Sequence, residues 1–324
     1  TLRQSLSTTI YKLYRNKSNE LHDQLTTIDP TTDSEQFELL KKRSTRADNC
    51  ADSLNKTQIK NNIMREARDL FYERKFEELM DSHNHILCFN NGVIDFDKQI
   101  FREGVPEDFN SKSTNIEYQP LDRTKDADVI QEIEEFMCQL FPIEDLRRYM
   151  WDHLASCLIG KNENQTFNIY NGVGRNGKSA LVTLMYKILG DYTGSVPITL
   201  ITQKRGLIGG TSSEVVNLRG TRYAVMQESS KGDQINEGIM KELTGGDKIT
   251  ARGLYKDAVT FVPQFKLVMM TNNLFDIKSN DDGTWRRIRI CEFLSLFTED
   301  PVEGDKEKPY QFKVDKKIDK KFDI

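Results

Sequence analysis

The sequence lacks the features that would place a protein in a membrane or outside the cell. Its 324 residues contain no run of about 18 apolar residues, which a transmembrane helix requires. The first residues, TLRQSLSTTIYKLYRN, are polar and have no apolar segment of a secretory signal. The five cysteines are scattered without a CxxC pair, which argues against a zinc ribbon or a disulfide framework. We therefore expect reduced thiols in an intracellular protein.

Positive charge is not in excess either. Lys and Arg number 46 against 50 Asp and Glu, so the formal net charge is −4. A protein that coats nucleic acid is usually basic. If this chain holds DNA, it must use a local basic feature, such as a loop that lines a channel.

The length and the two ends indicate a multidomain protein of which this chain is a part. A chain of 324 residues has room for two or three domains of about 100–200 residues each. The chain begins at Thr1 without a Met and ends abruptly at KKFDI. We expect a piece of a longer polypeptide, and a solvated connection from Thr298 to Ile324.

The N-terminal part shows mainly helical patterns. Residues 1–60 are polar and tolerate helix, with a turn near Pro30. Apolar residues then recur at helical spacing over 58–80 and predict an amphipathic helix that faces the core. The run HILCFNNGVIDFDKQIF predicts a hairpin around Asn90-Asn91-Gly92. A polar loop ends near residue 125.

Two further helices are predicted before the chain changes character. In DVIQEIEEFMCQLF the apolar residues fall on one face, and Pro142 follows. The next pattern, EDLRRYMWDHLASCLIG, runs to a stop signal at Gly160. These apolar residues are predicted to be core: Ile130, Ile133, Phe136, Met137 and Leu140.

A phosphate-binding loop stands in YNGVGRNGKS, residues 170–179. The pattern of Gly172, four free positions, then Gly177, Lys178 and Ser179 is the P-loop of nucleoside triphosphatases. The strand-like TFNIY precedes it and the helical SALVTLMYKILG follows, which is the context that a P-loop needs. Lys178 would place its cation between the β- and γ-phosphates of ATP, and the Ser179 hydroxyl would bind Mg²⁺. The nucleotide-contacting residues are predicted to be Gly172, Val173, Gly174, Arg175, Asn176, Gly177, Lys178, Ser179 and Ala180.

Two polar residues follow later β-rich runs and suit a hydrolysis site. RYAVMQE ends in Glu228, which could hold the metal and activate water, although it could also be an ordinary surface Glu. KLVMMTNN ends with Asn272, which could orient water at the γ-phosphate or could simply form a turn. Position 227 is Gln, so Glu228 would combine the roles of general base and Mg²⁺ ligand.

The run DDGTWRRIRICEF carries a pair of arginines. Arg286 and Arg287 could form a solvated basic face. They could also supply an arginine finger to the ATP site of a neighbouring subunit, which would require a ring.

These motifs, in this order, resemble a superfamily 3 helicase, and more narrowly the helicase part of the primase-helicases of poxviruses and related large DNA viruses. The motif-bearing stretch covers residues 150–297. The resemblance implies an α/β fold with an AAA+-like P-loop ATPase core: a parallel sheet flanked by helices, with an inserted β-hairpin and a smaller, mostly helical N-terminal domain. It also implies a Walker B acid at Glu228, a sensor at Asn272 and a trans-acting finger at Arg287, with Arg286 as the alternative.

The same resemblance gives a meaning to GGDKITARGLYKDAVTFVP. Two β-runs joined near Leu254 and Lys256 form a hairpin, and in the family such a hairpin projects into a channel and grips DNA. The alternative is a surface hairpin with incidental charge. The candidate DNA contacts are Lys248, Arg252, Tyr255 and Lys256: the cations suit phosphate, and a tyrosine can stack on a base.

Together these inferences predict an ATP-driven DNA helicase of viral genome replication, acting as a homo-hexamer in the host cytoplasm, with a primase as a possible partner. The expected regions are an N-terminal domain (1–125), a helical connector (126–160), the ATPase core (161–297) and the start of a C-terminal region (298–324). Two alternatives remain open: a ring that loads or packages DNA without unwinding it, and a P-loop nucleotide kinase. A kinase would need an Arg-rich lid, and no such cluster directly follows the P-loop helix.

Overall fold

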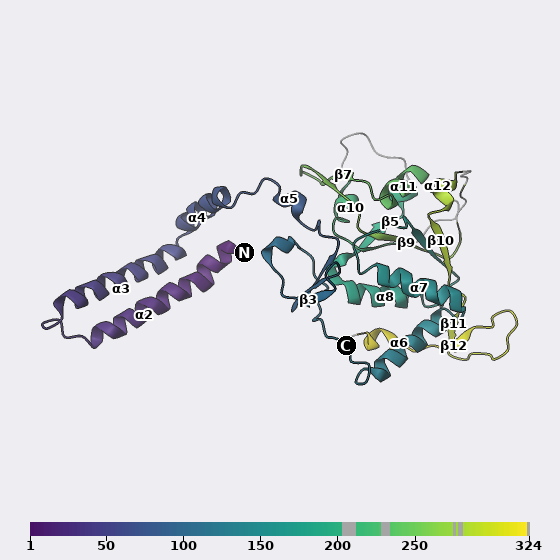
Figure 1. The fold of residues 1–324 in the computed structure, drawn as a ribbon, viewed down its shortest axis with the longest axis horizontal. Coiled ribbons are helices and arrows are strands. Elements are labelled where there is room, and N and C mark those ends of the chain that lie inside the picture. The colour runs from purple at the N-terminus through teal and green to yellow at the C-terminus, as the bar shows by residue number, and fades with distance from the viewer. Residues whose placement is uncertain (203–211, 228–233, 275–276, 278–280, 323–324) are drawn as a thin grey trace. The chain divides into compact units, whose positions relative to one another are not determined.

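The computed structural model describes residues 1–202, 212–227, 234–274, 277 and 281–322, and the chain divides into two compact units. The first unit spans Thr1–Lys75 and the second Phe76–Ile324. Figure 1 shows the course of the chain through both.

The first unit is helical. Helix α1 (Leu2–Ser5) continues through a π-helical turn, η1 (Leu6–Ile10), into α2 (Tyr11–Thr26), which α3 (Ser34–Asn55) follows after the turn near Pro30. The two long helices form a hairpin in which the Ser18 and Ser44 hydroxyls lie 3.4 Å apart. Arg15 pairs with Asp48 at 2.7 Å and with Asp52 at 2.8 Å. The polar, helix-tolerant pattern of residues 1–60 is therefore confirmed as a helical hairpin.

The helix predicted over residues 58–80 is shorter, and its apolar face is not core. Helix α4 (Thr57–Leu70) ends at Leu70, and the separate short helix α5 (Phe76–Leu79) begins the second unit. No residue of α4 is buried, and Leu70 and Phe71 are 78% and 74% exposed. Helical spacing shows which residues share a face, and this face is only partly covered: Ile59, Ile63 and Ala67 are half-buried, where α4 contacts α3 and α1.

The second unit begins with a small antiparallel sheet of β1 (Ile86–Phe89), β2 (Gly92–Asp95) and β3 (Ile100–Arg102). Phe89 pairs with Gly92, so the hairpin predicted at Asn90-Asn91-Gly92 is confirmed. A 3₁₀ turn, η2 (Pro106–Asp108), and irregular chain then lead to α6.

The centre of this unit is a five-stranded parallel sheet in the order β10-β4-β9-β6-β5. Its strands are β4 (Phe167–Asn171), β5 (Thr193–Pro197), β6 (Tyr223–Gln227), β9 (Lys266–Thr271) and β10 (Ile288–Glu292). Strands β4, β6 and β9 match the β-runs predicted from the sequence. Because the strands are parallel, their carboxyl ends share one edge, and this is the edge where ligands bind in such sheets.

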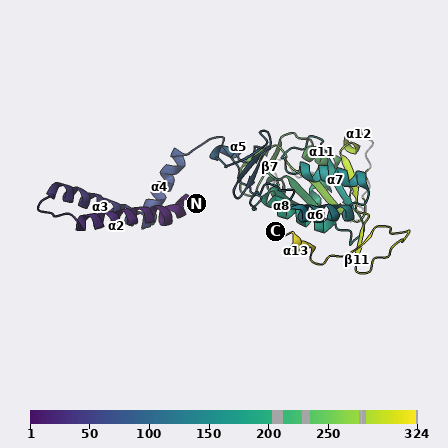
Figure 2. The same cartoon turned by 60° about the horizontal axis from the view of Figure 1, so that its bottom comes forward.

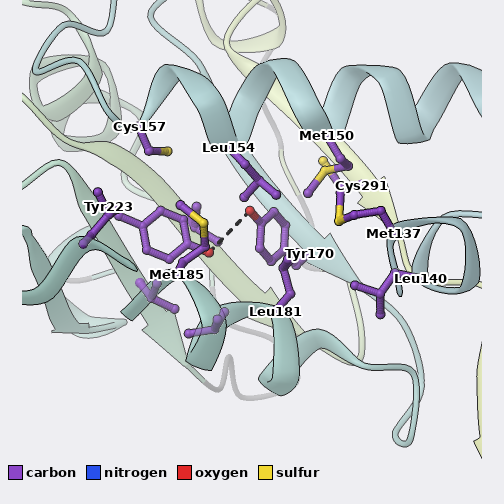
Figure 3. Close-up of a cluster of buried hydrophobic side chains, with 14 of the residues drawn as sticks. Met137, Leu140, Met150, Leu154, Cys157, Tyr170, Leu181, Met185, Tyr223 and Cys291 are labelled. Carbon is purple, nitrogen blue, oxygen red and sulfur yellow. Dashed lines mark hydrogen bonds between the residues drawn. The ribbon is translucent and has the colours of Figure 1, made fainter. Parts of the chain in front are cut away.

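Helices cover both faces of the sheet, as the alternation of side chains requires. Helices α6 (Ala127–Leu140), α7 (Glu144–Ser156) and α8 (Lys178–Leu189) pack on Tyr170, Tyr223 and Val268. Figure 3 shows part of this layer, including the 3.4 Å hydrogen bond from the Tyr223 hydroxyl to the Tyr170 hydroxyl. The predicted face of α6 is only partly correct, since Met137 and Leu140 are buried but Ile133 is 41% exposed.

The opposite face carries shorter elements, which pack on Ile169, Ala224 and Leu267. They are α9 (Thr199–Thr202), α10 (Ser213–Val216), α11 (Glu237–Thr244) and the hairpin of β7 (Ile249–Arg252) and β8 (Ala258–Phe261). Short links complete the unit: η3 (Gly190–Tyr192) after α8 and α12 (Asp282–Trp285) before β10. The predicted α/β fold, a parallel sheet flanked by helices with an inserted hairpin and a helical region before it, is confirmed.

The C-terminal residues are not the solvated connection that was predicted. Strand β11 (Leu296–Thr298) pairs in parallel with β12 (Gln311–Lys313), and α13 (Ile318–Lys321) follows. The Lys187 ammonium on α8 donates to the Asp319 carbonyl at 2.7 Å, and Lys321 forms an ion pair with Glu132 on α6. The composition of this region did not predict the two lysine contacts, because Lys187 and Lys321 reach their partners with the ends of long polar side chains.

Candidate nucleotide-binding site

The predicted P-loop joins β4 to α8 at the carboxyl edge of the sheet. Gly172 and Gly177 adopt φ angles of +152° and +83°. A Cβ on Gly172 would lie 2.7 Å from the Phe293 carbonyl oxygen, and one on Gly177 would lie 2.2 Å from Leu140 Cδ2. Both positions therefore require glycine for space as well as for backbone conformation.

Neighbouring strands hold the loop in place through backbone hydrogen bonds. The Gly172 N–H donates to the Thr271 carbonyl at 3.3 Å, and the Phe297 N–H donates to the Arg175 carbonyl at 2.8 Å. The buried Asn176 amide donates to the Phe293 carbonyl at 3.4 Å. The loop is thus tied to the ends of β9 and β10 and to β11. Gly174 is different, because a Cβ added there would meet none of the described atoms within 4 Å.

Lys178 is the first residue of α8, and its ammonium lies inside the loop. It donates to the Gly172 carbonyl and, at 3.3 Å each, to the side-chain oxygens of Asn176 and Asn272. Burial lowers the pKa of Lys178, and no carboxylate pairs with it within the described part of the chain. A cation that is desolvated and held by neutral oxygens gains most from an anion, and the start of the helix adds favourable dipoles for phosphate.

Asn272 reaches this ammonium because β9 lies directly between β4 and β6 in the sheet. A turn after the strand fixes its position: the Thr271 hydroxyl donates to the Asn273 carbonyl at 2.5 Å and accepts from the Asn273 N–H at 3.1 Å. The structure therefore brings together Lys178 and Asn272, which are 94 positions apart in the chain.

The two arginines have different surroundings. Arg287 is buried and donates to the Gly283 carbonyl at 2.6 Å and to Gln165 Oε1 at 2.7 Å, whereas Arg286 is exposed and shares Gln165 Oε1 at 2.5 Å. Gln165 in turn donates to the Gly245 carbonyl at 2.8 Å. No sequence signal pointed to Gln165, because a lone glutamine before a strand has no pattern.

The predicted hairpin is present and its tip is exposed. β7 and β8 pair in register from Ile249 with Phe261 to Arg252 with Ala258. Tyr255 is 95% exposed at φ +56°, and Lys256 is exposed beside it. The Arg252 guanidinium donates to the Lys256 carbonyl at 3.0 Å, which braces the tip.

Comparison with known proteins covers both halves of the chain. A family described as "D5 N terminal like" matches residues 4–141, and a family of unknown function (DUF5906) matches residues 170–287. The protein named "Putative helicase L207/L206" of Acanthamoeba polyphaga mimivirus is 36% identical over 297 residues, covering 92% of this chain and 30% of that protein. The chain belongs to the D5-like primase-helicases of large DNA viruses.

Another viral protein and a solved structure are also similar to the chain. The protein named "Putative primase C962R" of African swine fever virus (strain Badajoz 1971 Vero-adapted) is 27% identical over 264 residues, covering 79% of this chain and 26% of that protein. The chain thus spans less than a third of the length of these curated relatives. The apo structure of the NrS-1 C-terminal region is similar at 13% identity and a TM-score of 0.43, covering 59% of this chain and 42% of that one.

Two predicted features of the D5-like site concern the metal ion. Strand β6 ends at Gln227, and Glu228, the predicted metal ligand and general base, lies outside the residues that the structure describes. Ser179, the predicted Mg²⁺ ligand, is exposed at the second position of α8. Among the described residues no three His, Cys, Asp or Glu side chains gather as they would around a metal ion.

No helix within the described ranges has both the length and the apolar character that are needed to cross a bilayer. Membership in a replication helicase-primase family rests on the family matches and on the viral relatives.

Proposed function

We propose that this chain is the ATP-dependent motor of a viral replicative DNA helicase. The observation that carries the proposal is the arrangement of Lys178 within the P-loop and Asn272 at 3.3 Å from its ammonium, contributed by the neighbouring strand. A P-loop alone binds nucleotide. A polar amide from the adjacent strand at the same point supplies the group that can orient water or sense the γ-phosphate.

The glycine-rich loop fits a triphosphate. The glycines leave no room for a Cβ at either end of the loop. Among the described residues the acceptors of the Lys178 ammonium are neutral, and phosphate oxygens can replace them. Mg²⁺, when bound, neutralises charge on the β- and γ-phosphates. Ser179 and Glu228 are the proposed residues for holding it, with Glu228 also the proposed general base.

Hydrolysis is proposed to occur between subunits of a ring, with six subunits as the proposed number. An arginine finger must reach out of its own chain to the phosphates of its neighbour. Arg286 is exposed and would have to leave one bond, to Gln165, whereas Arg287 is buried and would have to leave its bonds to both Gly283 and Gln165. Both residues remain candidates, and Arg286 is now the better one.

The hairpin is the proposed contact with DNA. Its exposed tip offers Tyr255 for stacking and Lys256 for phosphate, and Lys248 and Arg252 add charge along the strands. Repeated around a ring, one basic tip per subunit would make a positive channel in a protein whose net charge is −4.

The primary test is ATP hydrolysis with and without single-stranded DNA. Lys178→Ala and Glu228→Gln should each lower the DNA-stimulated rate by at least about 100-fold, and Asn272→Ala should lower kcat while ATP binding changes little. Asn273→Ala is the matched control, since the Asn273 side chain has no hydrogen-bond partner among the described residues. Equal effects of Asn272→Ala and Asn273→Ala would contradict the assignment of Asn272.

A second measurement separates a helicase from a ring that only holds DNA. Strand displacement on a forked substrate, combined with sedimentation to count subunits, should show unwinding by a multimer. Lys256→Ala should reduce both DNA affinity and unwinding, whereas Lys125→Ala, an exposed lysine outside the hairpin, should change neither. Ring formation without strand displacement would favour a loader or packaging subunit.

A further inference from the structure

The side chain of Gln165 connects three parts of the second unit. Its Oε1 accepts from Arg286 at 2.5 Å and from Arg287 at 2.7 Å, and its Nε2 donates to the Gly245 carbonyl at 2.8 Å. These partners fix the orientation of the amide, because the reverse orientation would place its N–H groups against two cations. Both lone pairs of the oxygen are therefore taken by arginines, and the opposite side of the same amide holds a backbone carbonyl.

The loop before β4 fixes the backbone from which this amide extends. The Gln165 N–H donates to the Asn162 carbonyl at 2.9 Å, and the Thr166 N–H donates to Asn162 Oδ1 at 3.3 Å. Gln165 adopts φ +52°, in the left-handed region that few non-glycine residues occupy. Strand β4 begins at Phe167 and leads into the P-loop. The amide is thus anchored on the strand that carries the nucleotide loop.

The carbonyl that Gln165 holds lies at the base of the hairpin formed by β7 and β8. Gly245 is the C-cap of α11, and β7 begins at Ile249. The two strands of the hairpin pair in register up to the tip, where Tyr255 and Lys256 are exposed. A force on the tip is therefore carried along the paired strands toward Gly245.

Helices α11 and α12 lie side by side, as Figures 1 and 2 both show. Lys241 of α11 forms an ion pair with Asp281, and the Thr284 hydroxyl of α12 donates to Glu237 Oε2 at 3.0 Å. Helix α12 ends directly before the two arginines. The hairpin base and the arginine pair are therefore joined at two places, through these helices and through Gln165, and Gln165 contacts both guanidinium groups.

Two like charges share the single Gln165 oxygen. Burial and the neighbouring Arg286 charge lower the pKa of Arg287. The buried Nε of Arg287 has no hydrogen-bond partner among the residues that the structure describes. Because the two guanidinium groups repel each other, the shared oxygen offsets an unfavourable arrangement. When this acceptor turns away, the exposed Arg286 loses its bond to Gln165 and can move apart from Arg287.

We propose that Gln165 is a positioning residue through which DNA binding at the hairpin releases an arginine and so accelerates ATP hydrolysis. The amide is a rigid plane, so a shift of the Gly245 carbonyl that turns Nε2 also turns Oε1 away from the arginines. The released arginine can then reach the phosphates in the neighbouring subunit. This inference rests on the proposed function and adds its regulation by DNA. A contiguous set of hydrogen bonds is a physical route for such coupling.

Two substitutions of Gln165 separate its acceptor from its donor. Gln165→Met removes both, whereas Gln165→Glu keeps oxygens for the arginines and has no N–H for the Gly245 carbonyl. The measurement is kcat for ATP hydrolysis by the full chain, with and without saturating single-stranded DNA. Gln165→Met should release the arginines without DNA and raise the DNA-free kcat to within about twofold of the wild-type kcat with DNA. Gln165→Glu should retain them, so that its kcat with DNA stays within about twofold of its kcat without DNA.

A merely structural role would not produce opposite effects of these two substitutions. In both variants the KM for ATP and the Kd for DNA should change less than about twofold. Asn164→Ala is the matched control, since this exposed neighbour has no side-chain hydrogen bond within the described ranges, and it should keep the wild-type response to DNA. Wild-type stimulation by DNA in either Gln165 variant, or an equal slowing of both, would overturn the inference.

The same measurement distinguishes this inference from the function on which it rests. If DNA did not stimulate hydrolysis by the wild-type chain, the proposed function itself would fail. If DNA stimulated the wild-type chain and both Gln165 variants equally, only the role of Gln165 would fail.

The fluorescence of Trp285 reports the transmission step without hydrolysis. Trp285 is the last residue of α12, is 48% exposed and directly precedes Arg286, and the other tryptophan of the chain is Trp151. In a Trp151→Phe chain, single-stranded DNA should change the Trp285 emission. Adding Gln165→Glu should abolish this change, although the anisotropy of a labelled strand shows that DNA still binds. An equal change in emission with and without Gln165→Glu would overturn the inference.

Discussion

Lys178 and Lys266 are both buried lysines, 8% and 4% exposed. Lys178 lies at the carboxyl end of the strands of the parallel sheet, and Lys266 lies at their amino end. Lys266 is the first residue of β9, whereas Lys178 follows the loop at the end of β4. Within the described ranges neither ammonium pairs with a carboxylate. Burial lowers the pKa of both, that of Lys266 to about 8.

The acceptors of the two ammonium groups differ in kind. Lys266 donates to three backbone carbonyls at and just after the end of α7: Ser156 at 2.5 Å, Ile159 at 2.9 Å and Lys161. An ammonium has three N–H groups, so this site is saturated, and the nearby carboxyl end of a helix favours a cation. Lys178 instead meets one carbonyl and two amide side chains in a loop that is open to solvent around Val173. Its acceptors can be exchanged for a ligand.

The first prediction concerns the Lys266 site, in which three carbonyls saturate the ammonium group. Lys266→Met should lower the free energy of unfolding by about 3 kcal/mol or more, because it leaves three carbonyls without their donor and each costs about 1 kcal/mol or more. Urea unfolding followed by circular dichroism measures the change. Lys161→Met is the control, since that side chain is exposed while its carbonyl belongs to the same cluster. A loss below about 1 kcal/mol for Lys266→Met would show that water can replace the ammonium.

The second prediction concerns the Lys178 site, in which a ligand can replace the acceptors of the ammonium group. ATP with Mg²⁺ at about 100 times its Kd should raise the free energy of unfolding of the wild-type chain by about 2.7 kcal/mol. Lys178→Met should abolish this increase while changing the stability of the ligand-free chain by less than about 1 kcal/mol, since removing the desolvated cation offsets its lost hydrogen bonds. Thermal unfolding with and without nucleotide measures both quantities. A ligand-free chain destabilised as strongly as by Lys266→Met would remove the distinction between the two lysines.

The contrast between the lysines also shows what the sequence could and could not predict. The P-loop could be predicted because its glycines, Lys178 and Ser179 form a contiguous pattern between a strand and a helix. The proximity of Asn272 depends on the order of strands in the sheet, which residue periodicity does not encode. The family resemblance implied a sensor role for Asn272. Lys266 carried no signal, because a lysine before an apolar run is normally a solvated strand end.

Arg222 and the C-terminal region were missed for the same reason. Arg222 is buried at the start of β6, donates to the carbonyls of Leu158 and Ile86, and lies 4.6 Å from the Tyr192 ring centroid. Its partners come from three distant parts of the chain, so no local sequence pattern predicts that Arg222 is buried. The region from Thr298 onward likewise has an overall polarity that predicted a solvated connection, and only its contacts with α8 and α6 show otherwise.

The third prediction, which has the smallest expected effect, concerns the protonation of a buried histidine near Lys266. His153 is buried, its Nε2 lies 2.9 Å from the Tyr170 hydroxyl, and burial, with a further contribution from the Lys266 charge, lowers its pKa to about 3. In the unfolded chain its pKa is about 6.5, so below about pH 6.5 the unfolded state binds a proton that the folded state excludes.

Stability is therefore lost as the pH falls through about 6.5, and the loss at pH 5.5 is about 1.3 kcal/mol relative to pH 7. His153→Gln cannot titrate, so between pH 7 and 5.5 its unfolding free energy should fall by about that much less than in the wild-type chain. Urea unfolding of both proteins at the two pH values measures the difference. Parallel pH profiles for the two proteins would mean that His153 binds a proton in the folded state as readily as in the unfolded state. That outcome would contradict the lowered pKa of His153 in the folded chain.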